Sequence, residues 1–475
     1  MPRTTKKQSV AKAPKTAKKK IKKKAGAKDA ALKPKKAPSA LQSIRGMRDI
    51  LPLDQVYWRQ VRQKAGELAG TYGYERIDTP MIEDTNLFVR GVGKATDIIE
   101  KELYTFETKG GEQVSLRPEG TAPIVRAYIQ HGMLNLPQPQ KLWYLGPMFR
   151  YDRPQSGRYR QFYQAGYECI GDDDPVIDAQ LIVLGWNFLR ELGIEAEVRV
   201  NSLGTLDSRA NYREALIAYF RTKRAKLSDE DKKRLMKNPL RLLDSKDPAI
   251  QELKAEAPQI ADWLDEDSKN RFMRVLEYLD EVGVPYQFDP YLVRGLDYYE
   301  RTVFEFYAAE ENEKAQSALG GGGRYDPLIP MLGGREETPG AGMSLGLDRI
   351  VSKLKEQDRR DDQPRTYELK PCDIFLAQLG ERGRKRALSL FEEFRKAGVP
   401  VAEAFSKGNI KAQMEIANRR KAKWAIVVGQ KEVLDGTAII RDMDAGTQEI
   451  VDVKKVIAAV KKKLASLAES DTAEK

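Results

Sequence analysis

The sequence predicts an α+β protein with an antiparallel core, a helical segment that interrupts this core, and a small α/β domain at the end of the chain. Three observations predict it. Residues 141–171 contain two apolar strand patterns joined by a Pro- and Gly-containing loop, which is typical of a hairpin. Residues 203–285 have mostly helical periodicity, with a strand pattern only at their end. Residues 370–465 alternate between strand and helix patterns, as small α/β domains do.

The first 40 residues differ from the rest of the chain in composition. The whole chain has a formal net charge of +12, yet this segment holds 15 Lys and Arg residues and one acid, Asp29, so the remainder is slightly acidic. A Lys-, Ala- and Pro-rich segment buries too little apolar surface to offset its ordering entropy, so we expect disorder over 1–40. Contact with nucleic acid phosphates and a solvated, dispensable extension are both compatible with it.

Cysteine and histidine are the two rarest residue types of the chain, and their small number limits the metal sites and catalytic mechanisms that are possible. The two cysteines, Cys169 and Cys372, lie far apart in sequence, which fits a reducing, cytoplasmic compartment and no cysteine metal site. The one histidine, His131, lies in a helix-like run and is interpreted as structural. We therefore expect no protein-bound metal. No apolar run is long enough to cross a membrane, so no membrane partner is expected either.

The core elements follow in order. The spacing of apolar residues over 51–74 predicts a helix that ends at Gly70 and Gly73, and 75–84 reads as a strand leading into a turn. Residues 121–133 predict a second helix, and 141–150 and 160–171 predict the hairpin strands. In the second strand, Phe162, Gln164, Gly166 and Glu168 share one face because side chains alternate. A helix over 174–193 and a strand over 196–204 follow.

The remaining elements alternate between charged helices and apolar strands. Residues 211–227, 228–237 and 268–283 predict helices of an insertion over 203–285, and 284–290 contains the next strand pattern. Gly320–Gly323 alone favours a turn over close backbone approach to a ligand. Residues 340–354 read as a strand into a helix, and 358–369 as a linker. In the domain over 370–465 the last helix covers 453–467, and 466–475 is predicted to be a flexible tail.

Arginines are the most informative residues of the chain. Arg150, Arg294 and Arg349 lie in three near-apolar contexts, and Arg153, Arg158 and Arg160 cluster after Arg150. A guanidinium group presents a planar fork of donors that matches phosphate and carboxylate oxygens. One polyanionic ligand held from several sides is one interpretation. The alternative is a set of structural ion pairs with Glu119, Asp297 and Asp348.

Five motifs carry a resemblance to a known family. They are SLRPEGT, GPMFRYDRPQSGRYRQFYQAGYE, LVRGLDYYERTVFEF, GGGRYD and GMSLGLDRI, in this order. They resemble the signatures of histidyl-tRNA synthetase, a class II aminoacyl-tRNA synthetase, and the likeness spans about 41–460. NSLGTLDSRANYREAL and NPLRLLDSK resemble the insertion domain of the bacterial type.

The resemblance implies a fold and a reaction. The fold is a class II antiparallel-sheet catalytic core over 41–202 and 286–357, the helical insertion, and an anticodon-binding domain over 370–465. The reaction is ATP-dependent ligation of L-histidine to histidine tRNA through histidyl-adenylate, with release of AMP and diphosphate. ATP enters with Mg²⁺ as a substrate complex, and no tightly bound cofactor is implied.

The resemblance also implies residue roles. Arg150 and Arg294 are the catalytic residues, acting on the α-phosphate, and Arg349 holds the γ-phosphate. The implied ATP-binding residues are Arg150, Arg158 and Arg349. The implied histidine-binding residues are Glu119, Thr121, Arg150, Gln164, Glu168, Arg294, Tyr298 and Tyr299. Among these, Glu168 and Tyr299 meet the two imidazole nitrogens, and Glu119, Thr121 and Gln164 hold the α-amino group.

Contacts with RNA and with a second subunit are implied less directly. Gln155 resembles a residue that meets the extra 5′ nucleotide of histidine tRNA, although a solvent-exposed loop glutamine is the alternative. The basic cluster Arg419, Arg420, Lys421 and Lys423 suits phosphate contact or a solvated helix end. The segment GYERIDTPMIED resembles the class II dimer motif and implies a homodimer.

Two departures and two rival functions remain. The family commonly has His and Glu where Tyr151 and Asp152 stand here. The first rival is a regulatory paralogue that pairs with ATP phosphoribosyltransferase and typically lacks the catalytic motifs, the insertion and the anticodon domain. The second is a tRNA-binding protein without catalysis. The retained Arg150, Glu168 and LVRGLDYY disfavour both.

Overall fold

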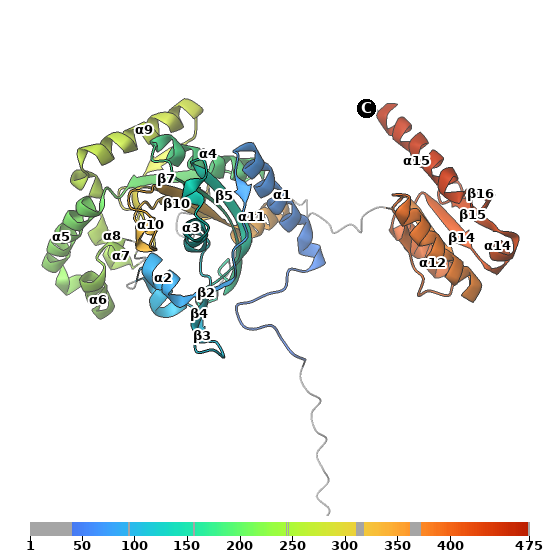
Figure 1. Cartoon of the computed structure of the whole chain (residues 1–475), viewed down its shortest axis with the longest axis horizontal. Coiled ribbons are helices and arrows are strands. Elements are labelled where there is room, and N and C mark those ends of the chain that lie inside the picture. Colours follow the sequence, from blue (N-terminus) through green and yellow to red (C-terminus); the bar gives the residue numbers. More distant parts are fainter. Residues whose placement is uncertain are drawn as a thin grey trace, which may run out of the picture. The chain divides into compact units, whose positions relative to one another are not determined.

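The computed structural model describes residues 40–93, 96–154, 157–243, 245, 247–309, 318–361 and 372–473 (Figure 1). The predicted disorder of 1–39 and most of the predicted linker, 362–369, lie outside the described residues. No helix within the described ranges is long and apolar enough to cross a membrane.

An eight-stranded sheet organises the core. Its order is β1-β5-β6-β11-β10-β9-β7-β8. The strands are β1 (Glu75–Arg76), β5 (Gln140–Phe149), β6 (Gln161–Ile170), β11 (Gly340–Gly346), β10 (Gly320–Arg324), β9 (Glu300–Ala308), β7 (Ala196–Ser202) and β8 (Tyr286–Phe288). The six central strands pair antiparallel, which confirms the predicted core. The pairs β1–β5 and β7–β8 at the two edges are parallel, which the sequence did not predict.

The predicted hairpin is confirmed as β5 and β6. The register runs from Gln140 opposite Ile170 to Phe149 opposite Gln161, so residues 150–160 form the connecting loop. Tyr167 and Cys169 point into the core that α1 (Gln55–Thr71), α4 (Pro175–Glu191) and α11 (Leu347–Arg360) share with the sheet. The alternate residues, including Gln164 and Glu168, therefore face the opposite side of the sheet.

The opposite side of the sheet carries smaller elements. The predicted helix over 121–133 is shorter, as α3 (Thr121–Gln130), and it packs against α2 (Thr85–Gly91). Beside α2, β2 (Ile82–Asp84), β4 (Gln113–Leu116) and β3 (Thr105–Glu107) form a three-stranded antiparallel sheet.

The segment predicted as an insertion is helical, with more helices than the three predicted. It contains α5 (Leu206–Thr222), α6 (Asp229–Lys237), α7 (Leu240–Leu243), α8 (Pro248–Lys254) and α9 (Glu266–Val282) (Figure 1). Thr205, Ser228, Asp247 and Asp265 accept hydrogen bonds from the backbones of the helices that follow them, as N-caps do. The apolar side of α9 joins the core beside α4, so α9 also forms part of the core layer.

The glycine run forms a strand, so the favoured turn interpretation is wrong. Gly320–Gly323 belong to β10, between β9 and β11. A Cβ atom on Gly322 would lie 2.1 Å from the carbonyl oxygen of Gly342, so only glycine fits there. Gly323 has φ +155°, which side chains disfavour. The neighbouring strands therefore approach this strand more closely than a side chain would allow.

The C-terminal domain has its own sheet and core. The strand order is β13-β12-β14-β15-β16, with parallel pairs around β12 and antiparallel pairs beyond β14. The strands are β13 (Ala402–Glu403), β12 (Ile374–Gln378), β14 (Trp424–Val428), β15 (Thr437–Asp442) and β16 (Gln448–Asp452). The helices are α12 (Gly380–Lys396), α13 (Ile410–Arg419), α14 (Gln430–Asp435) and α15 (Val456–Ala473). Since α15 runs to Ala473, residues 466–473 are helical where a flexible tail was predicted.

A buried ion pair joins β10 to α4 and generates a stability prediction. Arg324 and Asp178 are 1% and 2% exposed, and their charged atoms lie 2.8 Å apart. Asp178→Ala leaves a buried guanidinium group without its main partner, so we expect the free energy of unfolding to fall by about 3 kcal/mol in urea denaturation. The control is Asp173→Ala, since Asp173 is exposed and its ion pair is at the surface. Equal losses in the two variants would contradict the prediction.

Candidate functional site

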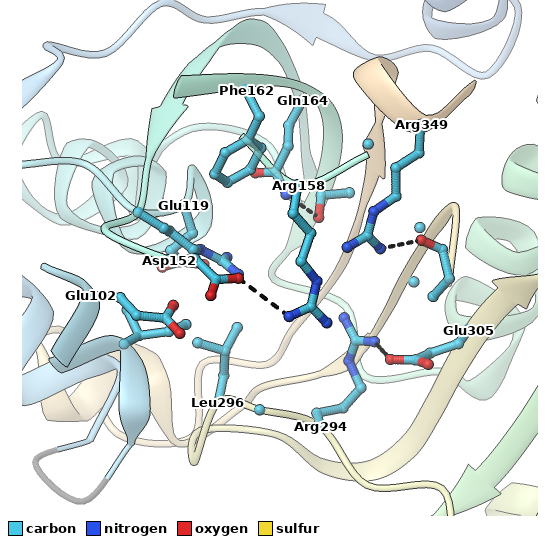
Figure 2. Close-up of a pocket in the computed structure, with 18 of the residues that line it drawn as sticks. Glu102, Glu119, Asp152, Arg158, Phe162, Gln164, Arg294, Leu296, Glu305 and Arg349 are labelled. Carbon is cyan, nitrogen blue, oxygen red and sulfur yellow. Dashed lines mark hydrogen bonds and ion pairs between the residues drawn. The ribbon is translucent and has the colours of Figure 1, made fainter. Parts of the chain in front are cut away.

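A cavity of about 410 Å³ opens on the face of the large sheet opposite the core helices (Figure 2). Its walls come from β6, β10, β11, the loop after β5 and the segment that precedes β9. The sequence-predicted site residues that line it are Glu119, Thr121, Arg150, Arg158, Gln164, Arg294, Tyr298, Tyr299 and Arg349. Glu168 lies beneath them, and Gln155 falls outside the described residues. The structure thus brings together residues that are up to 230 positions apart in the sequence.

The arginines surround the cavity, and backbone carbonyl groups hold two of them. Arg150 follows β5, donates from Nε to the Pro118 carbonyl at 2.9 Å, and stacks over the Phe162 ring at 5.4 Å. Arg349, in the first turn of α11, donates to the Ala318 carbonyl at 2.5 Å. Burial, together with the nearby guanidinium groups of Arg158 and Arg150, lowers the pKa of Arg349. These guanidinium groups on the cavity wall are suited to hold the oxygens of a polyanion.

Within the described part of the chain, Arg150, Arg294 and Arg349 form none of the ion pairs with Glu119, Asp297 and Asp348 that the alternative requires. Arg294 pairs with Glu305, and Arg158 lies 3.2 Å from Asp152 (Figure 2). Burial alone would lower the pKa of Arg294, but Glu305 and the adjoining tyrosine hydroxyls outweigh it, so the group stays charged. Figure 2 shows the labelled guanidinium groups of Arg158, Arg294 and Arg349 pointing toward the same space.

Asp348, the third carboxylate of that alternative, has other partners. It accepts from Arg48 Nη2 at 2.8 Å and from the Tyr163 backbone N–H at 2.7 Å. These bonds fix the start of α11, where Arg349 stands.

Glu168 is a fully buried carboxyl group with two side-chain donors. Thr121 Oγ1 donates to its Oε1 at 2.8 Å, and Tyr325 Oη donates to its Oε2 at 2.7 Å. Burial raises the pKa of Glu168 to about 8, although both hydrogen bonds act to lower it. Sequence analysis missed Tyr325, and its only signal there is its place in GGGRYD, two residues after the glycine run.

Glu119 forms a second buried acceptor. It accepts from Tyr298 Oη at 2.8 Å and from the Ala122 backbone N–H at 2.9 Å, and burial raises its pKa. Tyr299 packs beside Tyr298, with ring centroids 4.7 Å apart, and the Arg294 guanidinium group lies 5.3 Å from the Tyr299 centroid. These contacts join the predicted amino-acid residues to the predicted phosphate residues.

Gln164 has an oxygen that is available to a ligand. Its Nε2 donates to Ser344 Oγ at 3.2 Å. Its Oε1 is buried and finds no hydrogen-bond partner among the residues that the structure describes. A buried amide oxygen of this kind is stabilised when a ligand N–H group reaches it.

Glycines leave the space that the buried carboxyl groups need. A Cβ on Gly342 would lie 1.8 Å from Glu168 Oε2. A Cβ on Gly120 or Gly166 would lie 2.2 Å from the Tyr144 ring. Tyr144 is buried between the two glycines and is a site neighbour that the sequence did not indicate.

Contacts of Arg160 hold the loop between β5 and β6 in place. Arg160, unassigned in the sequence, stacks on the Tyr151 ring at 3.7 Å and donates to the Arg45 carbonyl at 3.4 Å. Its backbone N–H donates to the Gly46 carbonyl at 2.7 Å. Arg160 is therefore a support for the loop. Arg153 is exposed and lines no described part of the cavity.

The structure also places the residues that were considered for metal binding and for RNA contact. Within the described ranges, no group of three or more His, Cys, Asp or Glu side chains is arranged to hold a metal ion. His131 caps the C-terminal end of α3 and does not line the cavity. Arg419, Arg420, Lys421 and Lys423 lie in and around the turn between α13 and β14, which is compatible with both interpretations of the cluster.

Comparison with known proteins identifies relatives along most of the chain. Residues 46–350 match the family model described as histidyl-tRNA synthetase, and residues 373–463 match the anticodon binding domain. A histidine–tRNA ligase of Dehalococcoides mccartyi is 45% identical over 424 residues, which cover 89% of this chain and all of that protein.

Solved structures agree with this result. Apo histidyl-tRNA synthetase of Staphylococcus aureus has a TM-score of 0.71 and 34% identity, over 88% of this chain and 99% of that one. A Bacillus halodurans protein described as an ATP phosphoribosyltransferase regulatory subunit/histidyl-tRNA synthetase has a TM-score of 0.57 and 23% identity, over 83% of this chain and 99% of that one. The second likeness concerns the fold alone.

The raised pKa of Glu168 predicts a pH-dependent stability. Between its ordinary value of 4.5 and about 8, the unfolded chain loses this proton and the folded chain keeps it. The free energy of unfolding of the ligand-free protein should therefore fall as the pH rises through this range, by on the order of 1 kcal/mol per pH unit from this group. Glu168→Gln should remove that part of the slope in denaturation measured from pH 5 to pH 9.

The control for this prediction is Glu75→Gln, a change at an exposed residue of β1. It should leave the slope as in the wild type. An unchanged slope in Glu168→Gln would show that the carboxyl group is ionised throughout the range.

Proposed function

This chain belongs to the histidyl-tRNA synthetase family, and from that premise we propose how its cavity carries out the reaction. Its activity is that of a histidine–tRNA ligase. One observation supports the assignment of the cavity above the others. Two buried carboxyl groups, Glu119 and Glu168, lie under a ring of guanidinium groups that includes Arg150, Arg294 and Arg349. An amino acid with an α-ammonium group and a hydrogen-bonding side chain fits below, and a triphosphate fits above.

The arginines serve the first step of the reaction. The carboxylate of histidine attacks the α-phosphorus of ATP, a P–O bond forms, and the bond to the diphosphate leaving group breaks. Negative charge builds on the phosphoryl oxygens, and preorganised cations stabilise it. Arg150 and Arg294 act at the α-phosphate, and Arg349 and Arg158 hold the other phosphates. Because carbonyl groups or Glu305 already fix three of these side chains, little reorganisation is needed.

The second step transfers the histidyl group from the adenylate to a ribose hydroxyl of the terminal adenosine of tRNA and releases AMP. Gln155 contacts the 5′ end of the tRNA, and the domain over 373–463 binds the anticodon. Mg²⁺ enters as part of the ATP complex. Such a complex needs only one or two protein carboxylates, and Glu102 and Asp152 line the cavity.

Histidine is selected by its two ring nitrogens. Glu168 accepts from one imidazole N–H group, and the Tyr299 hydroxyl meets the other nitrogen. Tyr325 and Thr121 hold the Glu168 carboxyl in place. Glu119, Thr121 and the unpartnered Gln164 Oε1 receive the α-ammonium group. An amino acid without the imidazole nitrogens would leave these buried polar groups unpaired. Its kcat/KM would therefore be several orders of magnitude below that of histidine.

The regulatory paralogue and the non-catalytic tRNA-binding protein are both less well supported. The catalytic arginines, Glu168, the insertion and the C-terminal domain all occur in this chain. A cytoplasmic location remains the expectation that the cysteine content favours.

Arg294→Ala provides the test of the catalytic assignment. Histidine-dependent exchange of labelled pyrophosphate into ATP should lose at least about a hundredfold in kcat, because one preorganised donor is removed from the developing charge. Binding of tRNA should be unchanged in a filter-binding assay, since Arg294 serves phosphate transfer. The control is Arg190→Ala, an exposed arginine at the end of α4. Exchange at the wild-type rate in Arg294→Ala would remove the role assigned to this residue.

We also propose that the chain forms a homodimer through the three-stranded sheet β2-β4-β3. Ile82, Leu116, Val114 and Phe106 lie on one face of this sheet, by the register of its strands. Ile82 and Phe106 are 48% and 43% exposed, and the neighbouring Met81 is 50% exposed. An apolar face of this kind, next to the segment that resembles the dimer motif, suits a second copy of the chain.

Sedimentation tests the dimer. The wild-type protein should sediment as a dimer at micromolar concentration, and the double variant Ile82→Asp with Phe106→Asp should sediment as a monomer. Leu388→Asp, on the exposed side of α12, is the control because Leu388 is also strongly exposed, at 56%. A monomeric wild-type protein, or a double variant that stays dimeric, would refute this interface.

A further inference from the structure

We propose that Arg209, in the helical insertion, is a positioning residue for histidine selection, because its guanidinium group holds the backbone that carries Tyr298 and Tyr299. The inference rests on the proposed function of these tyrosines in the amino-acid pocket. Arg209 does not line the catalytic cavity, and nothing in its sequence context distinguishes it from the other arginines of the insertion.

The segment between β8 and β9, residues 289–299, contains no helix or strand. It nevertheless presents Arg294, Tyr298 and Tyr299 to the cavity, and the two tyrosines are 1% and 5% exposed. A segment without a regular hydrogen-bond ladder needs other bonds to fix its carbonyl and amide groups. Asn201 of β7 supplies one, donating from Nδ2 to the Leu292 carbonyl at 2.9 Å.

Arg209 supplies the bonds nearest the tyrosines. Its Nη1 donates to the Asp297 carbonyl at 3.1 Å and to the Tyr299 carbonyl at 2.6 Å. These two carbonyl groups lie on either side of Tyr298 in the chain. One guanidinium group therefore fixes the backbone before and after Tyr298, whose hydroxyl donates to Glu119 at 2.8 Å.

The Arg209 guanidinium group is partly removed from solvent, so its hydrogen bonds must replace those it would make with water. Burial lowers the pKa of Arg209, and Asp297 acts in the opposite direction. The donors of Arg209 go to neutral carbonyl groups, although a carboxylate is close by. Both carbonyl groups belong to the 289–299 segment, so these bonds help to fix the positions of the two tyrosines.

Asp297 is held from both sides. Asn238, after α6 of the insertion, donates from Nδ2 to Asp297 Oδ1 at 3.2 Å. On the core side, the Asp297 backbone N–H donates to the Val92 carbonyl at 3.2 Å. A Cβ on Gly93 would lie 2.7 Å from Asp297 Oδ2, so the core leaves this side chain little room. Arg209 and Asn238 thus link the insertion to the histidine pocket through one residue.

The base of Arg209 is itself fixed. It lies in the first turn of α5, whose N-cap Thr205 donates to Asp265 Oδ2 at 3.1 Å. Ser208 and Ser268 donate to the same oxygen at 2.8 and 2.9 Å. These bonds tie the first turns of α5 and α9 together, so Arg209 projects from a rigid corner of the insertion.

The experiment compares Arg209→Ala with Arg213→Ala. Arg213 lies one turn further along α5, and both arginines line the same 360 Å³ cavity between the insertion and the core. Among the described residues, Arg213 donates to the Lys237 carbonyl, at 3.4 Å, and not to the tyrosine segment. In pyrophosphate exchange, Arg209→Ala should raise the KM for histidine about tenfold and leave the KM for ATP within about twofold. Arg213→Ala should change neither KM by more than about twofold.

Two further variants test the positioning role if Arg209→Ala does not fold. Arg209→Lys keeps the charge, but its ammonium group is one bond closer to the backbone than Nη1 and reaches the two carbonyl groups less well. Its KM for histidine should therefore lie between those of the wild type and the alanine variant. Asn238→Ala removes the second contact with Asp297 and should raise the same KM. Melting temperatures measured alongside show whether each variant is folded.

The outcomes separate the inference from the proposed function. An unchanged KM for histidine in Arg209→Ala, equal increases in the two KM values, or an equal effect in Arg213→Ala would overturn the positioning role. Wild-type protein without histidine-dependent exchange would instead overturn the proposed function of the cavity.

Discussion

The buried carboxyl group of Glu168 is the constraint on which the arrangement of the site depends. A carboxyl group without solvent requires donors of its own, and Thr121 and Tyr325 supply them from α3 and from the turn after β10. It also requires space, which glycines at 342 and 166 leave around it and around Tyr144. These residues come from the hairpin, α3, β11 and the turn after β10, so the position of one side chain fixes how these elements meet.

The two faces of β6 have different roles, because one packs into the core and the other faces the cavity. Ala165, Tyr167 and Cys169 pack into the core beneath the helices, and the alternate residues Gln164 and Glu168 face the cavity. The same division holds around the arginines, because Arg324 is paired inside the core whereas Arg294 reaches the cavity. On β6, the place of a residue on the strand therefore decides whether its side chain packs into the core or faces the ligand space.

Local patterns allowed part of this to be predicted. The hairpin and the shared face of Gln164 and Glu168 follow from a period of two, and most of the site residues came from motif resemblance. The partners of those residues did not follow, because Glu305, Tyr325 and Arg209 meet the site only through tertiary contacts. The glycine strand gave no strand pattern, since glycine has no side chain to alternate. The last two turns of α15 were missed because their small polar residues resemble those of a disordered tail.

The glycine strand has a further consequence for how this pocket can change. Gly320 and Gly321 form part of the cavity wall with backbone atoms alone. A Cβ on Gly321 would lie 2.5 Å from the Phe304 carbonyl oxygen and 2.9 Å from Arg294 Nη1. A single substitution there cannot add a contact without disturbing the strand pair, so this wall is closed to gradual evolutionary adjustment. New substrate preferences would have to arise on β6 or in the 289–299 segment, where side chains already face the ligand space.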